Sequence, residues 1–191
     1  MGSSLEQIAE RHRARADLYA AIGRLLRQPP VPDDLLVLRA VLSRHSATGG
    51  GGDAGRPLDV LRMLAAAPDL AGARREYRAR LGEGLVDLAC EPSYSAVPDA
   101  AYAAVGMSPS ADKVRELEVL AALNQRAADA AVHGDAHESH RLGSLERRYL
   151  SAHAGVCLAT LAGQLRKSDG FYGELGAALE ALLEDEVHAG G

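Results

Sequence analysis

Carboxylates, histidines and two cysteines are the residues of this sequence whose types suit chemistry, and none of them falls into a catalytic pattern. The chain lacks a GxSxG nucleophile turn, an HExxH zinc motif, a dinucleotide-binding fingerprint and a cysteine placed with a histidine. Isolated carboxylates do not by themselves indicate acid–base catalysis. The sequence therefore favours a binding protein, and we expect that the chain is not an enzyme.

A group of histidines is the nearest approach to a metal-site pattern. His133, His137 and His140 lie close together, with two carboxylates between them. Gly134 interrupts the helical frame, so we interpret the stretch as a polar turn between two helices. We expect the protein to hold no metal and no cofactor.

The two cysteines, Cys90 and Cys157, lie far apart in the sequence and outside any CxxC spacing. This spacing indicates neither a disulfide framework nor a zinc knuckle. We expect two reduced thiols.

Length and charge narrow the function classes further. The 191 residues suit a single domain, 1–191, with a flexible glycine-rich loop at about 47–56 that lacks the Lys and Ser/Thr of a phosphate-binding loop. A net charge of -5 disfavours nucleic-acid binding. The N-terminus has no secretory apolar region, and no apolar run is long enough to cross a bilayer. We expect a cytoplasmic protein that binds no nucleic acid and has no stable membrane insertion.

Apolar residues that recur at three- and four-residue steps predict an all-α fold. Capping-box patterns at Ser3 and Ser4 begin the first helix, and the pair Pro29-Pro30 ends it. Further helices are expected from about 33 and over 57–66, 68–81, 99–105, 110–133, 138–167 and 171–187. We predict a single-domain helical bundle of about eight or more helices without strands. Residues 82–98 break the periodicity, and such long irregular connections are often functional.

Four segments, taken in order, carry a resemblance to a known family. RADLYAAIGRLLRQPP is similar to an R-x-x-x-Y-x-x-L-x-x-L helix that ends in proline. YRARLGEGLVDLACEPSYSAVPDAAYAAVG is similar to E-Y-x-x-L/F-x-x-G followed by P-P-Y-E-S and a helix ending in glycine. SPSADKVRELEVL is similar to P-x-D-H-x-x-x-E-L-x-x-L, and RRYLSAHAGVCLATLAGQLRKSDGFYGEL to an F-L-x-x-H-L-x-x-W helix with a closing helix. In this order the segments resemble the TorD/NarJ family of molybdoenzyme-specific chaperones.

The matching residues are spread over most of the chain. They are Tyr77, Leu81, Gly84, Pro92, Tyr94, Ser95, Tyr102, Gly106, Asp112, Glu116, Leu117, Leu120, His153 and Tyr172. The chain departs from the pattern at Lys113, where the family often has histidine, and at Val156 and Cys157, which stand around the place of a tryptophan.

The resemblance implies a TorD-like fold and a cytoplasmic chaperone. Such a chaperone binds the N-terminal leader, often a twin-arginine signal peptide, and the apo form of the catalytic subunit of a molybdenum oxidoreductase during cofactor insertion. The client would belong to the dimethyl sulfoxide reductase superfamily. Nitrate reductase, dimethyl sulfoxide or trimethylamine oxide reductase and related dehydrogenases remain alternatives.

Paired arginines and an apolar stretch in a leader require carboxylates and an apolar groove. The client-binding residues expected from the resemblance are Glu83, Asp87, Glu91, Pro92, Tyr94, Ser95, Asp112, Lys113, Glu116 and His153. The five carboxylates in this set would form an acidic patch, with a solvated surface as the alternative for each. Tyr94 is equally compatible with a structural plug, Lys113 with pairing to a neighbouring acid, and His153 with a hydrogen-bonded core histidine.

Two other function classes remain open. Arg11, Arg13 and Arg15 motivate an all-helical transcription regulator, which salt-dependent DNA binding would support. A generic helical scaffold subunit would instead stay in a fixed complex. Both a monomer and a domain-swapped dimer are compatible with the glycine-rich loop, which would allow the first two helices to exchange.

Overall fold

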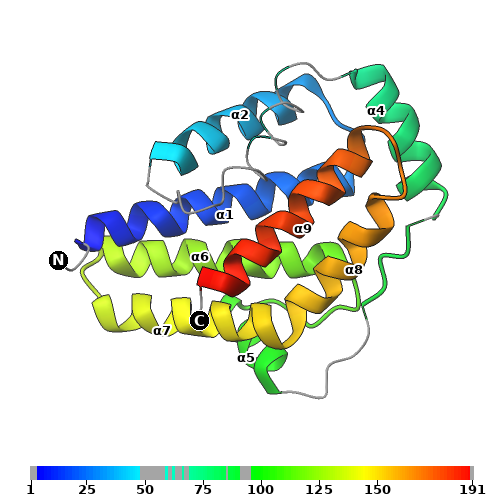
Figure 1. The fold of residues 1–191 in the computed structure, drawn as a ribbon. Helices are drawn as coiled ribbons and strands as arrows, with labels where there is room; N and C mark the ends of the chain where they lie inside the picture. The colour runs from blue at the N-terminus through cyan, green and yellow to red at the C-terminus, as the bar shows by residue number, and fades with distance from the viewer. Residues whose placement is uncertain are drawn as a thin grey trace.

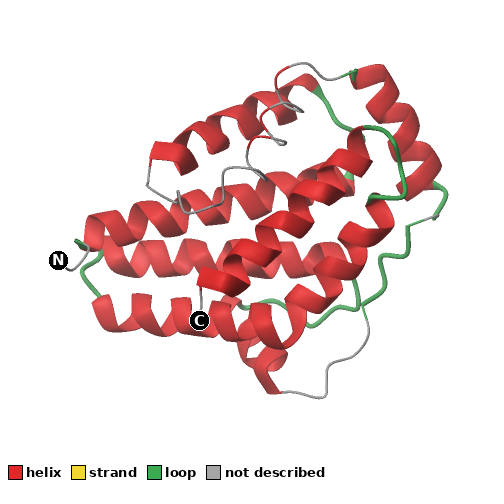
Figure 2. Ribbon diagram, viewed as in Figure 1, coloured by secondary structure: helices red, strands yellow, loops and turns green. Residues whose placement is uncertain are grey.

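The structure, a computed structural model, describes residues 4–47, 59, 62, 66, 69–84, 86–90 and 96–189. This part of the chain is helical and has no strand (Figure 2). Its β-type contact is an isolated bridge between Ala89 and Asp112. The predicted all-α class is confirmed. No helix among the described residues is long and apolar enough to cross a membrane.

Seven continuous helices make up the described part. They are α1 (Leu5–Arg27), α2 (Pro32–Ala47), α4 (Leu70–Tyr77) with the π-helical turn η1 (Arg78–Gly82), α5 (Ala96–Val105), α6 (Lys113–Val132), α7 (Ala136–Tyr149) joined through the π-helical turn η2 (Leu150–Ala154) to α8 (Gly155–Leu165), and α9 (Phe171–Ala189). Eight or more were expected. The helix predicted over 57–66 falls almost wholly outside the described residues, as does the glycine-rich loop beyond Ala47.

Local sequence signals explain where the longest helices begin and end. The side chains of Ser4 and Gln7 form a reciprocal capping box at the start of α1, as predicted. Gln28 ends α1 directly before the two prolines. Gly134, with a φ of 80°, separates α6 from α7, because a left-handed conformation costs glycine little.

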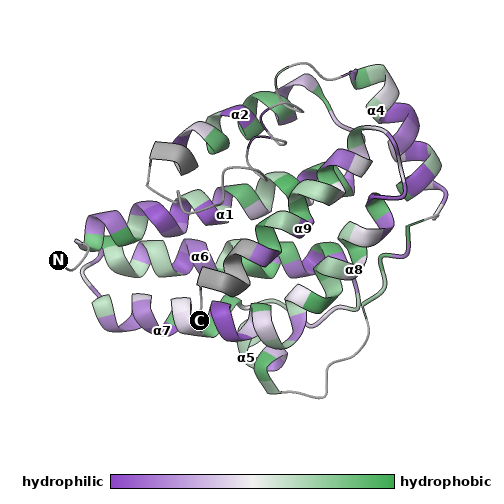
Figure 3. Ribbon diagram, in the orientation of Figure 1, coloured by the Kyte–Doolittle hydropathy of each residue, from purple (hydrophilic) through white to green (hydrophobic). Residues whose placement is uncertain are grey.

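The helices pack in rows. Figure 1 shows α2, α1, α6 and α7 lying side by side, with α9 crossing in front of α1 and α6 and packing on α8. The most extensive helix contact is between α1 and α6, which are distant in sequence. Apolar residues of all these helices form one buried cluster, and polar residues are concentrated on outer faces such as that of α4 (Figure 3).

Candidate functional site

The irregular segment after η1 is held against the start of α6. The backbone N–H of Lys113 donates to the carbonyl of Leu88 at 2.7 Å, beside the bridge between Ala89 and Asp112. The Asp112 carboxylate accepts from the N–H of Val114 at 2.9 Å and thereby caps α6, as predicted. This short backbone pairing positions the residues that the sequence singled out.

The residues of the expected acidic patch differ in their exposure. Glu83 and Asp87 are exposed, and Asp112 is partly exposed. Glu116 is completely buried, which corrects its assignment to a surface patch. Glu91 lies outside the described residues, as do Pro92, Tyr94 and Ser95.

Lys113 is buried, and its environment differs from the expectation. Its ammonium group donates to the backbone carbonyl of Asp87 at 2.8 Å. The Asp87 carboxylate instead accepts from the N–H of Ala89 at 2.8 Å. Lys113 is therefore bound to the peptide backbone of the irregular segment and fixes that segment to α6, and it is not paired with the Asp87 carboxylate.

Two tyrosines satisfy the buried Glu116. The hydroxyl of Tyr102 donates to Oε1 at 3.0 Å, and the hydroxyl of Tyr149 donates to Oε2. Burial and the charge of Glu116 raise the pKa of Tyr102 to about 12. The same causes, in the same order, raise the pKa of Tyr149. Both hydroxyls therefore remain protonated donors at neutral pH, which is what a buried carboxylate needs.

His153 lies beside this cluster in η2. Its side chain is 11% exposed, and its Nε2 lies 3.6 Å from Oε1 of Glu116. Its ring also contacts that of Tyr149, with centroids 5.8 Å apart. These contacts favour the core-histidine interpretation over a direct contact with a client.

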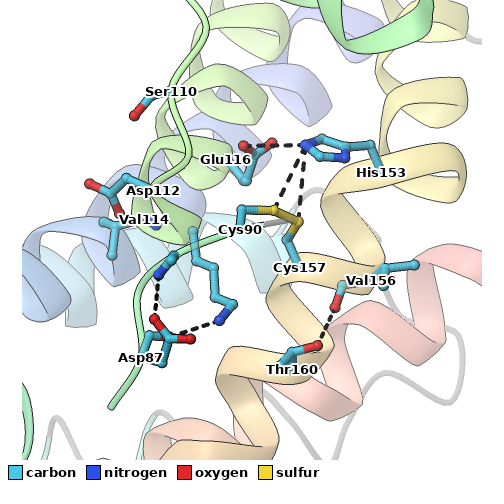
Figure 4. Close-up of a disulfide and its surroundings, with 12 residues drawn as sticks. Asp87, Cys90, Ser110, Asp112, Val114, Glu116, His153, Val156, Cys157 and Thr160 are labelled. Atoms are coloured by element: carbon cyan, nitrogen blue, oxygen red, sulfur yellow. Dashed lines mark hydrogen bonds and ion pairs between the residues drawn. A yellow bond between two sulfur atoms is a disulfide. The ribbon is translucent and has the colours of Figure 1, made fainter. Parts of the chain in front are cut away.

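Cys90 and Cys157 are joined as a disulfide, which corrects the expected pair of free thiols (Figure 4). The sequence could not show this disulfide, because it depends on tertiary packing. The segment before Cys90 pairs with the start of α6, and Cys90 there meets Cys157 of α8. The two Cα atoms lie 5.7 Å apart, within the range for disulfides. His153 Nε2 lies 3.9 Å from Sγ of Cys90 and 4.0 Å from Sγ of Cys157. By contrast, the groups of potential metal ligands in the described residues do not include His133, His137 or His140.

A groove of about 530 Å³ runs between α1 and α6. Small residues form much of its lining, namely Ala16, Ala20, Gly23, Ala121 and Ala122. On α1 these small residues recur at four- and three-residue steps, a pattern that is visible in the sequence. Their small side chains help to leave this groove open along the surface of the two helices.

Charged side chains line the rim of this groove. Arg27 binds the carboxylates of Asp112 and Glu118, the latter at 3.1 Å from both Nε and Nη2. Asp17 pairs with Arg44 at 2.9 Å. The side chains of Arg27, Asp112 and Glu118 are 40%, 28% and 32% exposed. Asp112, which the sequence singled out, is therefore part of a carboxylate pair that already holds a guanidinium at the groove.

A second buried polar group lies deeper between α1, α6 and α7. Asn124 is fully buried and accepts from Nδ1 of His12 at 2.8 Å while donating to Glu146 at 3.3 Å. Arg15 pairs with the same Glu146 oxygen at 2.9 Å. Burial lowers the pKa of His12 and outweighs the hydrogen bond to Asn124, which raises it. Arg15 is thus engaged inside the bundle and is not part of a free basic surface.

Comparison of the chain with protein-family models, with curated proteins and with solved structures gives no match.

Proposed function

We propose that the protein is a TorD/NarJ-type cytoplasmic chaperone and not an enzyme. It would bind the arginine-bearing leader and the apo form of a molybdopterin oxidoreductase catalytic subunit, a member of the dimethyl sulfoxide reductase superfamily, during cofactor insertion. The ordered motif resemblance supports the family. One structural observation carries the binding site: Asp112 and Glu118 hold a guanidinium at the rim of a groove lined by small residues.

The Arg27 side chain shows what these carboxylates accept. An arginine fork donates several hydrogen bonds in one plane, which a pair of carboxylates can receive. Ion pairs this exposed contribute about 0–1 kcal/mol to stability. A leader arginine can therefore replace Arg27 at low cost, while the adjoining apolar stretch of the leader lies in the α1–α6 groove.

A labelled synthetic peptide with paired arginines followed by an apolar run tests this site by fluorescence anisotropy. A peptide with paired lysines should bind more weakly, because an ammonium group cannot form the planar fork. Asp112→Asn keeps a good helix cap but removes the charge, and it should weaken binding about tenfold. Glu118→Gln should have a similar effect.

Glu138→Gln is the matched control, because Glu138 is a partly exposed carboxylate paired with Arg141 on α7 and does not line the groove. It should leave the affinity unchanged. Equal losses in Glu138→Gln and Glu118→Gln would contradict the assignment of the groove.

The client is identified by affinity capture with the tagged protein from a native host that is expressing molybdoenzymes, followed by mass spectrometry. We expect a molybdopterin-enzyme catalytic subunit, and we expect the Asp112→Asn/Glu118→Gln double variant to recover less of it. Recovery of DNA or of a fixed metabolic complex instead would refute the chaperone proposal.

A further inference from the structure

Three side chains with atoms that bind soft metals meet beside α6. The Sγ atoms of Cys90 and Cys157 and a ring nitrogen of His153 all lie within 4.8 Å of one another (Figure 4). We propose that, once the disulfide is reduced, these three residues bind one Zn²⁺ ion. The inference rests on this geometry and is independent of the proposed chaperone function.

The distances suit a tetrahedral zinc site. With zinc–sulfur bonds of about 2.3 Å and zinc–nitrogen bonds of about 2.0–2.1 Å, the sulfur–nitrogen edge of the tetrahedron is about 3.5 Å and the sulfur–sulfur edge about 3.8 Å. The two sulfur–nitrogen distances here are 3.9 and 4.0 Å. Binding thus requires the two reduced sulfurs to separate by side-chain rotation, while the imidazole is already close to its place.

Three structured elements hold the ligands. The backbone pairing of Leu88 with Lys113 fixes the chain just before Cys90, and Cys157 lies in the first turn of α8. His153 lies in the π-helical turn η2, a type of turn that often occurs at functional sites. Gly155 permits this turn, because a Cβ at that position would lie 2.6 Å from the carbonyl oxygen of Leu150.

The groups buried around the two cysteines also support a metal site. A structural disulfide needs neither an imidazole nor a carboxylate, yet both are buried next to this one. Three protein ligands leave a fourth position for water, and Oε1 of Glu116, 3.6 Å from the same imidazole nitrogen, can accept a hydrogen bond from that water. The hydroxyls of Tyr102 and Tyr149 hold this carboxylate in place.

A trialkylphosphine can reduce the disulfide in a balanced reaction. The phosphine attacks one sulfur, the S–S bond breaks, and water supplies two protons to the sulfurs and its oxygen to the phosphine, which leaves as the phosphine oxide. Zn²⁺ then displaces one proton from each thiol and binds the two thiolates and the neutral imidazole.

The test uses the full chain, reduced with the phosphine, freed of it by gel filtration under nitrogen, and titrated with Co²⁺ and then Zn²⁺. We expect one Co²⁺ per chain, with a thiolate charge-transfer band and the visible bands of tetrahedral cobalt. One equivalent of Zn²⁺ should abolish both, because Zn²⁺ binds such sites more tightly. The oxidised protein should show no thiolate band.

Substitutions separate the three ligands from other residues. Cys157→Ser should halve the thiolate band, and both Cys157→Ser and His153→Asn should weaken Zn²⁺ binding at least tenfold. The matched control is His133→Asn, at an exposed histidine that ends α6, and it should bind as the unaltered chain does. Far-UV circular dichroism restricts the comparison to folded variants.

Absence of the thiolate band from the reduced unaltered protein would overturn the proposal without any substitution. Equal Co²⁺ binding by the oxidised and reduced forms, or equal losses in His133→Asn and His153→Asn, would also overturn it.

Discussion

Tyr149→Phe tests whether Glu116 is a charged acceptor inside the core. Tyr149 is fully buried, and its hydroxyl donates to Oε2 of Glu116, so the substitution removes a hydrogen bond and leaves the ring in place. Hydrogen bonds to charged groups contribute about 1.5–3 kcal/mol to stability. We expect the free energy of unfolding to fall by about 2 kcal/mol. For a domain of this size, the corresponding decrease in Tm is about 4–8 °C.

Tyr172→Phe is the matched control for this experiment. Tyr172 is equally buried, but its hydroxyl donates to the neutral backbone carbonyl of Leu25 at 2.8 Å. A neutral hydrogen bond contributes about 0.5–1.5 kcal/mol. Tyr172→Phe should therefore destabilise the protein by about half as much as Tyr149→Phe.

Urea unfolding followed by circular dichroism at pH 7 gives both values, and unchanged m-values show that the two variants unfold from comparable states. A loss for Tyr149→Phe no larger than that for Tyr172→Phe would refute the reasoning. Glu116→Gln completes a double-mutant cycle, in which the coupling energy with Tyr149 should be about 1 kcal/mol or more.

Three further predictions are measured in the same way. Burial lowers the pKa of His12, so the unfolded chain binds a proton at this residue more readily than the folded protein does. The free energy of unfolding should therefore be greatest above about pH 6.5 and fall as the pH drops below that value. His12→Asn should flatten this pH dependence, and an unchanged slope would contradict the prediction. Gly134 has a φ of 80°, so Gly134→Ala should destabilise the protein by about 1 kcal/mol. Gly163 lies on α8 with open space around its Cβ position, so Gly163→Ala should stabilise the protein by about 0.5–1 kcal/mol. Effects of the same sign in the two variants would contradict this reasoning from backbone conformation. With EDTA present, reduction of the disulfide should lower the free energy of unfolding by about 2–4 kcal/mol. The stability of the Cys90→Ser variant should not change on reduction. Equal stability of the oxidised and reduced unaltered protein would contradict the prediction.

Most helix boundaries could be predicted because they depend on neighbouring residues. The capping box at Ser4, the paired prolines after Gln28, and Gly134 between α6 and α7 act over a few positions, and the structure confirms each. The π-helical turns were not predicted, because each spans only five residues within a longer helix and such turns are rare. Gly155 is the sequence signal for the second of them.

The site residues were harder to predict, because their roles depend on what lies opposite them. The motif resemblance indicated Asp112, Lys113, Glu116 and His153, and the structure brings the segments that carry them together around the start of α6. Only the packing shows that Asp112 binds Arg27 at the rim of a groove while Glu116, one turn further along, is buried. Neighbouring turns of a helix can face solvent or core, and the partner helices decide which.

The sequence by itself determined that the described part of the chain is helical, where most of its helices begin and end, and that the helical pattern breaks after about residue 82. These properties follow from local periodicity, capping and backbone stiffness. The tertiary structure alone decided that Cys90 meets Cys157 and His153, that two tyrosines satisfy Glu116, and that α1 and α6 leave a groove with carboxylates at its rim. These contacts join residues far apart in the chain, so they depend on how the helices pack and not on any local signal.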